Sequence, residues 1–252
     1  MCTLTVYSGK KRCVVTMNRD ELRTRKEAGV LHSKSINDIR FFHPVDLVSG
    51  GTWFGVNNQG VILALLNRYQ APQTKEAKSR GDIIPAALAQ GGRSAVQSWL
   101  QELSYVDYNP FDLFLISKKK VMQFSWDSEK YSSEAIKFKR WFMFTSSGLM
   151  TEEVIAYRQN LFNAWSHEMG KKLTSSEEIL RGFHLIQFDG METHSVLMER
   201  EKSHTRSVIQ ADIEGKKIQV KYIPDILENA IDLPLSGAQE ASLEIKKHLP
   251  KL

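Results

Sequence analysis

The sequence has few cysteines and no long apolar run, and both shortages limit where the protein can work. Only two of its 252 residues are cysteine, Cys2 and Cys13, which is too few for a disulfide framework and favours a reducing compartment. No apolar stretch has the roughly 18 residues that a membrane-spanning helix needs. The first apolar run is interrupted by Ser8-Gly9-Lys10-Lys11-Arg12, unlike the core of a signal peptide. We therefore expect a cytoplasmic protein without a membrane span.

The common motifs of cofactor and metal sites are also missing. There is no GxGxxG fingerprint, no P-loop, no HExxH pair and no CxxC pair, and these are usual signs of dinucleotide, nucleotide and metal sites. The 34 basic and 29 acidic residues leave a formal net charge of only +5, spread along the chain. Such a small excess does not call for a nucleic-acid partner. We expect no metal, no cofactor and no nucleic acid at the functional site.

The sequence does have a cysteine at position 2, directly after the initiator Met1. Initiator methionine is usually removed when the next side chain is small, and removal would give Cys2 a free α-amine. The thiol then has an ordinary pKa of ~8.5 and the amine one of ~7.7–8.0, so the amine can act as the base that generates the nucleophilic thiolate. The alternative is that Cys2 is a packing residue, as most free cysteines are.

Four polar residues follow the second β-rich run of the chain. Residues 2–7 and 12–17 are separated by a short polar loop, which predicts a β-hairpin. The quartet Asn18-Arg19-Asp20-Glu21 then stands at a strand end beside Cys2. An arginine near a thiol lowers the thiol pKa, and an aspartate can hold an α-amine by hydrogen bonding. The alternative is an ordinary solvent-exposed charged run.

Three further positions contain candidate site residues. Asn67 ends the apolar run 61–67, where it is either an amide donor to an oxyanion or a turn asparagine. Gly51 and Trp53 either bring backbone and an aromatic wall to a ligand, or form a β-bulge beside a core tryptophan. Arg206 enters an apolar strand and needs a partner, which is either a ligand carboxylate or phosphate or a structural salt bridge.

The remaining periodicities predict a single α+β domain over residues 1–252. No linker, internal repeat or low-complexity segment divides the chain. Residues 22–48 carry few periodic signals and predict a loop, and residues 226–252 predict a peripheral tail. We expect strands at 50–56, 61–67, 111–117, 121–126, 140–145, 208–211 and 217–223, and helices within 83–103, 151–169 and 175–184. This order suits helices that cover an antiparallel sheet system.

In combination these residues resemble the NRDE family, the family of transport and Golgi organisation protein 2. The resemblance runs in order through Met1-Cys2, Asn18-Arg19-Asp20-Glu21, Gly50-Gly51-Thr52-Trp53-Phe54-Gly55, Leu66-Asn67, Arg80-Gly81 and Thr205-Arg206-Ser207. That family is similar in turn to the N-terminal nucleophile (Ntn) hydrolases with a cysteine nucleophile. The resemblance implies their fold, a four-layer α-β-β-α sandwich. One departure is Ser147, which lies in a segment where relatives often carry asparagine.

The resemblance also implies a reaction and a set of site residues. The reaction is hydrolysis or acyl transfer on a non-peptide amide or acyl ester, through a thioester. The implied catalytic residues are Cys2 as the nucleophile, Arg19 beside it, Asp20 at the α-amine, Asn67 in the oxyanion hole and Arg206 as a late active-site arginine. We assign substrate binding to Asn18, Gly51, Trp53 and Ser147.

A non-catalytic protein is the alternative on the same fold. It would bind or carry a lipid-like ligand or haem without turnover, and the serine at position 147 fits this case. The fold does not distinguish the two functions, since one fold can host unrelated activities. The expected partner in either case is a small amide, acyl or lipid-like molecule, with haem as the other candidate.

Overall fold

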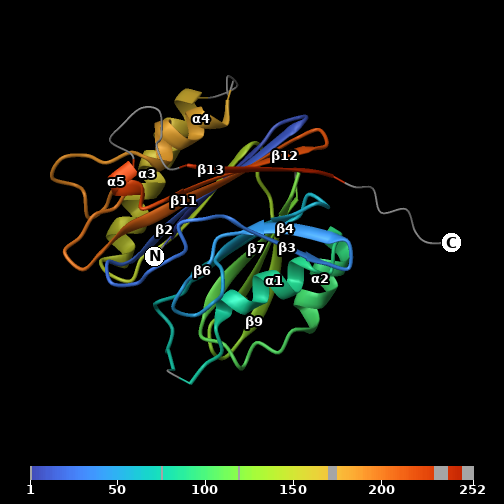
Figure 1. Ribbon diagram of the computed structural model, residues 1–252. Coiled ribbons are helices and arrows are strands. Elements are labelled where there is room, and N and C mark those ends of the chain that lie inside the picture. The colour runs from blue at the N-terminus through green and yellow to red at the C-terminus, as the bar shows by residue number, and fades with distance from the viewer. Residues whose placement is uncertain (1, 75, 119, 170–174, 230–237, 246–252) are drawn as a thin grey trace.

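The computed structural model describes residues 2–74, 76–118, 120–169, 175–229 and 238–245. These residues form two antiparallel β-sheets that lie face to face, with helices on the outer face of each sheet (Figure 1). The layers therefore follow the α-β-β-α order that the family resemblance implies. In the described ranges, no helix is long and apolar enough to cross a membrane.

The first sheet combines strands from both ends of the chain. Its order is β10-β1-β2-β11-β12-β13. Its strands are β1 (Cys2–Ser8), β2 (Arg12–Leu22), β10 (Trp141–Ser146), β11 (Ser203–Glu214), β12 (Lys217–Pro224) and β13 (Gln239–Glu244). The segment 226–252, expected to be a peripheral tail, thus supplies an edge strand whose Leu243 packs in the core. Residues 230–237 and 246–252 of that segment lie outside the described residues.

The second sheet follows the chain order from β3 to β9. Its strands are β3 (His32–Ile36), β4 (Ile39–His43), β5 (Phe54–Asn57), β6 (Ile62–Asn67), β7 (Phe111–Ser117), β8 (Lys120–Trp126) and β9 (Tyr131–Ile136). The expectation of a loop over 22–48 is wrong, because this stretch holds the hairpin of β3 and β4. The expected strand at 50–56 begins only at Phe54, because the preceding Gly50 has a φ of 72°.

Helices cover the outer face of each sheet. The helical elements are η1 (Arg80–Asp82), α1 (Ile83–Leu88), α2 (Arg93–Glu102), α3 (Thr151–Met169), α4 (Ser176–Ile179), η2 (Leu180–His184) and α5 (Ile226–Asn229). α1 and α2 pack on the second sheet through residues such as Ile84 and Leu100. α3 and η2 pack on the first sheet through Phe162 and Phe183.

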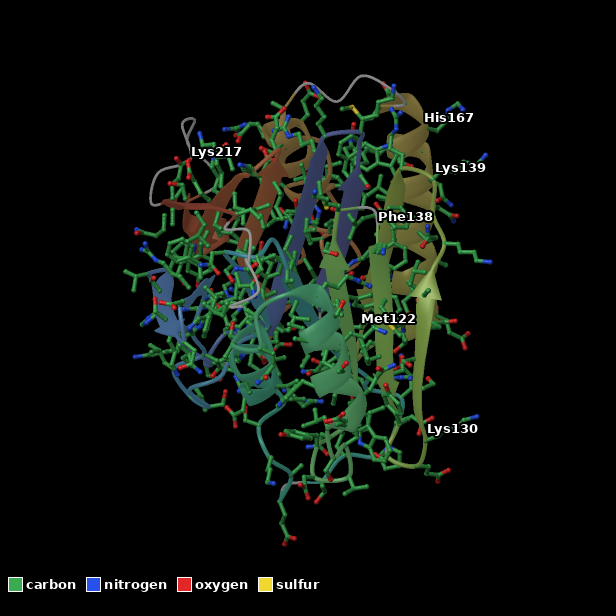
Figure 2. The ribbon with its side chains drawn as sticks, turned by 90° about the vertical axis from the view of Figure 1, so that its right-hand side faces the viewer. Met122, Lys130, Phe138, Lys139, His167 and Lys217 are labelled. Carbon is green, nitrogen blue, oxygen red and sulfur yellow. The ribbon has the colours of Figure 1, made fainter. Side chains whose placement is uncertain are left out.

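The largest apolar core lies between the two sheets. Leu4 and Met17 of the first sheet share this core with Phe54 and Phe114 of the second, so burial of apolar surface holds the two sheets together. Charged side chains lie on the outside of the sandwich, as Figure 2 shows for the exposed Lys139. The polar residues buried at the strand ends therefore need a separate explanation.

Candidate active site

Strand pairing sets the geometry around Cys2. Cys2 lies opposite Arg19 of β2 on one side and opposite Ser146 of β10 on the other. Residues directly opposite each other in antiparallel strands point to the same face of the sheet, so all three side chains face the second sheet. Asn18 and Asp20 are one position away from Arg19, so they face the helices. The strand pleat therefore divides the quartet between two faces of the sheet.

A cavity of about 440 Å³ lies beside the Cys2 thiol. Residues from the first sheet, from β6 and from the loops before β5 and α1 form its wall. Six of the nine candidate residues line it: Cys2, Arg19, Asp20, Gly51, Trp53 and Asn67. Asn18, Ser147 and Arg206 are not part of this wall. The structure thus brings most of the candidates together around one cavity.

The Cys2 thiol is buried, with 7% of the residue exposed. Burial raises the pKa of this thiol, and the nearby Asp20 carboxylate raises it further. The N-terminal ammonium, the charge of Arg19 and a hydrogen bond from the Asp20 backbone N–H act in the opposite direction, but the net effect is a raised pKa. Arg19 thus favours the thiolate, as expected, but burial outweighs its effect on the thiol pKa.

Three carboxylates compete with the thiol for the charge of Arg19. The Arg19 guanidinium donates to Asp46 Oδ2 at 2.5 Å, to Glu27 Oε2 at 3.1 Å and to Glu21 Oε2 at 3.4 Å. Its Cζ atom also lies 4.4 Å from the ring centroid of Trp53, which is cation–π distance. Arg19 therefore organises the cavity wall, and its charge is shared between these carboxylates and the Cys2 thiol.

Asp20 is held from the opposite face by an arginine that the sequence reasoning missed. Arg158 of α3 is completely buried, and its Nη1 lies 3.3 Å from Asp20 Oδ2. Thr205 Oγ1 donates to the other carboxylate oxygen of Asp20 at 2.7 Å. A signal for Arg158 exists in the sequence, because it falls between Val154 and Phe162 on the buried stripe of its helix. An arginine at such a position needs a buried partner.

Asn18, which we assigned to substrate binding, lies outside the cavity wall, and its side chain makes structural hydrogen bonds. Its Nδ2 donates to the carbonyl oxygens of His184 at 2.9 Å and Val196 at 3.0 Å, and its Oδ1 contacts His184 Nδ1. The other ring nitrogen of His184 contacts Thr5 Oγ1 at 2.6 Å. Burial lowers the pKa of His184 to about 3. Asn18 therefore fastens the η2 segment to the outer face of the first sheet.

The serine paired with Cys2 is Ser146, whereas Ser147, which we assigned to substrate binding, lies outside the cavity wall. Ser147 Oγ donates to the carbonyl oxygen of Leu149 at 2.6 Å, in the turn before α3. Ser146 Oγ is buried and has no hydrogen-bond partner among the described residues. Because Ser146 is paired with Cys2 across the strands, its hydroxyl is the free donor nearest in register to the thiol.

A β-bulge keeps Arg206 away from the cavity wall. The register of β11 against β2 shifts between Thr205 and Ser207, so Arg206 is the extra residue. Its guanidinium forms an ion pair with Asp225 Oδ1 at 2.8 Å. The structural salt bridge considered for Arg206 is therefore present, and the structure does not support its placement as an active-site arginine.

The second sheet and its loops supply the remaining wall. A Cβ atom added to Gly51 would lie 2.7 Å from the Cα of Gly81, so two glycine backbones cross in direct contact. The close contact at Gly51 is thus with the backbone of Gly81 and not with a ligand. Trp53 Nε1 is buried without a hydrogen-bond partner among the described residues. Asn67 Nδ2 donates to Tyr69 Oη at 3.2 Å at the cavity edge.

The described residues contain no group of three or more histidine, cysteine, aspartate or glutamate side chains placed to hold a metal ion. The site therefore consists of a buried thiol, compensated ion pairs and a few free hydrogen-bond donors.

Comparison with known protein families identifies the family of this chain. The family model of Transport and Golgi organisation 2 (TANGO2) matches residues 1–225. The chain belongs to the TANGO2 family. No curated protein matches the chain. The match spans the strands that carry Cys2, the quartet and Arg206, so all nine candidate site residues lie inside the TANGO2 region.

Solved structures show the fold that this TANGO2 chain shares. A Caenorhabditis elegans ortholog of N-acylethanolamine-hydrolysing acid amidase superposes with a TM-score of 0.59 at 12% identity, covering 85% of this chain and 93% of the other. A variant of the conjugated bile acid hydrolase from Clostridium perfringens gives 0.53 at 11% identity, covering 96% and 92%. These likenesses show an Ntn-hydrolase-like fold, which confirms the fold prediction.

Proposed function

We propose that this protein is an N-terminal cysteine amidohydrolase or acyltransferase for a non-peptide amide or acyl ester. The observation that carries the proposal is the position of the Cys2 thiol in a cavity wall, paired in register with Arg19 and Ser146. Family membership and the Ntn-hydrolase-like fold support the same chemistry.

Removal of Met1 is the activating step in this proposal. With Met1 present, the thiol has a raised pKa and its own nitrogen is in a peptide bond. Removal gives Cys2 an α-amine with a pKa near ~7.7–8.0, which can accept the thiol proton. The resulting ammonium lies beside the thiolate and favours its charged form. Asp20, whose carboxylate already acts on the Cys2 thiol, holds this ammonium.

The reaction then proceeds by acyl transfer. The Cys2 thiolate attacks the carbonyl carbon, a C–S bond forms, and the carbonyl π electrons move to oxygen. The oxyanion accepts hydrogen bonds from Asn67 Nδ2 and the Ser146 hydroxyl. The C–N bond breaks as the α-ammonium gives its proton to the leaving amine. Water, deprotonated by the α-amine, forms a C–O bond to the thioester carbon, and the C–S bond breaks to release the acid and the thiol.

Exposed apolar residues near Asn67 support an acyl group with lipid-like character. Tyr69, Leu149 and Met150 are 37%, 60% and 46% exposed. Tyr69 accepts the hydrogen bond of Asn67, and its ring lies 3.3 Å from where a Cβ on Gly148 would be. These side chains therefore give an acyl chain an apolar surface next to the cavity. The neighbouring cavity wall then receives the carbonyl group.

Binding without turnover is the second candidate function. The raised pKa of the Cys2 thiol favours it in a chain that keeps Met1, because a neutral thiol is a weak nucleophile. A lipid-like ligand suits the apolar residues at the cavity edge. For haem, Cys2 is the one residue of the described wall that belongs to the usual axial ligand types of His, Cys, Met and Tyr.

The test compares protein with and without Met1, with the N-terminus verified by intact mass. Each form is incubated with the lauroyl amide of a fluorogenic aminocoumarin, and mass spectrometry maps the acylated peptide. We expect the trimmed protein to release aminocoumarin and carry the acyl group on Cys2, and Cys2→Ala to do neither. Cys13→Ala is the matched control, because burial raises the pKa of Cys13 to about 12. A trimmed, folded protein that binds the amide without acylation would favour the binding function.

A further inference from the structure

One cation of the cavity wall has no carboxylate partner. Arg80 belongs to η1 and lines the cavity that contains Cys2. Its Nη1 donates to the carbonyl oxygen of Pro110 at 2.8 Å and to Gln73 Oε1 at 3.5 Å. Both acceptors are neutral, and no carboxylate of the described residues forms an ion pair with Arg80. Its positive charge is therefore uncompensated at short range.

The other cations of the wall are all neutralised. Arg19 is paired with Asp46, and Arg25 Nε lies 2.7 Å from the same carboxylate. Lys78 forms an ion pair with Asp107 at 2.9 Å. The wall carboxylate Asp46 and the nearby Asp107 are thus already engaged by other cations.

Asp20 does not supply the missing partner either. Arg158 holds its carboxylate from the helix side of the sheet. Glu21 also lines the wall, but it contacts Arg19 at 3.4 Å and Arg25 at 3.8 Å and acts on Arg80 only at longer range. The three carboxylates of the cavity wall thus face other cations, and the Arg80 guanidinium is open to an anion that enters the cavity.

The surroundings of Arg80 make its charge costly. Burial lowers the pKa of Arg80, although Tyr69, Glu21 and Cys2 oppose that effect. A half-buried guanidinium gains from a bound anion, because the anion replaces hydration that burial removed. Its planar fork matches the oxygens of carboxylate, sulfonate and phosphate groups. Because Arg80 and Cys2 line the same cavity, an anion bound to the guanidinium would share that cavity with the thiol.

We propose that the substrate carries an anionic group, which Arg80 binds while Cys2 faces the amide carbonyl. Together with the apolar surface at Tyr69 and Leu149, this defines the substrate class as an N-acyl amide with a carboxylate, sulfonate or phosphate. The assignment rests on the proposed function for its chemistry, but the anion site can be tested by binding alone. A second unpartnered group in the same wall, Trp53 Nε1, is available to one oxygen of the ligand.

The test uses Cys2→Ala protein and isothermal titration calorimetry, so that turnover does not complicate binding. The ligands share a lauroyl chain and differ in the amine half: N-lauroylglycine, N-lauroyltaurine, N-lauroyl-O-phosphoethanolamine and the neutral N-lauroylethanolamine. We expect at least one anionic ligand to bind roughly 10- to 100-fold more tightly than the neutral one, as a charge-assisted hydrogen bond gives. The anionic ligand that binds most tightly identifies the type of anion that Arg80 prefers.

A second substitution then locates the anion site. Adding Arg80→Gln should bring the anionic-to-neutral affinity ratio close to one. Arg181→Gln is the control, because it removes the same charge from an arginine that is paired with Glu177 in the outer helical layer, and it should preserve the ratio. Equal binding of anionic and neutral ligands, or an unchanged ratio in Arg80→Gln, would overturn the proposal.

The outcomes also separate this inference from the proposed reaction. Anion preference without any acylation of trimmed protein supports the Arg80 site and rejects the hydrolase. Acylation of the trimmed protein without anion preference supports the hydrolase and rejects the Arg80 site. If Arg80→Gln does not fold, because Arg80 also holds the Pro110 carbonyl, the salt dependence decides. In the protein that keeps Arg80, the ratio of anionic to neutral ligand affinity must then fall as the salt concentration rises. A ratio that does not change with salt rejects the anion site.

Discussion

Replacing Arg158 with methionine would remove the cation that lies against the buried Asp20 carboxylate. At the 3.3 Å separation of the two groups, the Coulomb attraction is about 5 kcal/mol for an effective dielectric constant of about 20. Neutral acceptors also lose their donor, including Thr3 Oγ1 at 2.8 Å and the carbonyl oxygen of Ser195 at 2.9 Å. Methionine fills most of the side-chain volume, so the loss of charge dominates over a cavity.

We expect Arg158→Met to lower the free energy of unfolding by about 3–5 kcal/mol, the usual cost of an uncompensated buried charge. Urea unfolding followed by tryptophan fluorescence measures this as a shift in midpoint at constant slope. Arg181→Met is the matched control, because Arg181 forms a partly exposed ion pair with Glu177, and it should change stability by less than about 1 kcal/mol.

A double-mutant cycle tests whether the charge itself is responsible. Adding Asp20→Asn to Arg158→Met removes the stranded carboxylate, so the double variant should lose at least about 1 kcal/mol less than the sum of the two single variants. Additive losses would refute the ion-pair explanation. A loss of under about 1 kcal/mol in Arg158→Met would refute the claim that this contact stabilises the fold.

Two other predictions concern the helical layer and the cavity wall. His184 has a folded-state pKa of about 3, below its ordinary value of ~6.5, so its contribution to stability is complete above pH 6.5 and is lost as pH falls. Urea titrations should show about 2–3 kcal/mol of this loss between pH 6.5 and 4.5, and a smaller loss in His184→Gln. Gly51→Ala should cost about 1–3 kcal/mol by thermal unfolding, because its Cβ would meet Gly81. Gly29→Ala, with no atom within 4 Å of the added Cβ, should be nearly neutral.

The sequence was sufficient to place Cys2 beside the quartet, because two short β-rich runs joined by a polar loop define an antiparallel pair. It did not show how far β2 extends. Pairing with β11 continues the strand to Leu22, so the quartet lies within the strand and its side chains alternate. Asn18 lies on the helix side of the sheet for this reason: a quartet at a strand end can gather on one side, whereas a quartet inside a strand cannot.

Other errors arose where the decisive partner is distant in sequence. The bulge at Arg206 exists only in the pairing of β11 with β2, and nothing local to residues 205–207 specifies it. The hairpin of β3 and β4 lacks apolar alternation because β3 is exposed, although Asn37-Asp38 is a recognisable turn pair. Arg158 was visible as a charged residue in an apolar helical stripe, but its partner could be identified only from the fold.

The charge pairing around Cys2 indicates which single event can change the state of the thiol. Arg19 is compensated by three carboxylates, and Asp20 is compensated by Arg158. Arg19 therefore has little charge to spare for a thiolate, whose formation burial and the Asp20 carboxylate both oppose. Removing Met1 moves the N-terminal ammonium onto Cys2 itself, next to the thiol, and no existing ion pair has to break. On this argument the binding and hydrolytic functions correspond to the two states of the N-terminus, with the same cavity in both.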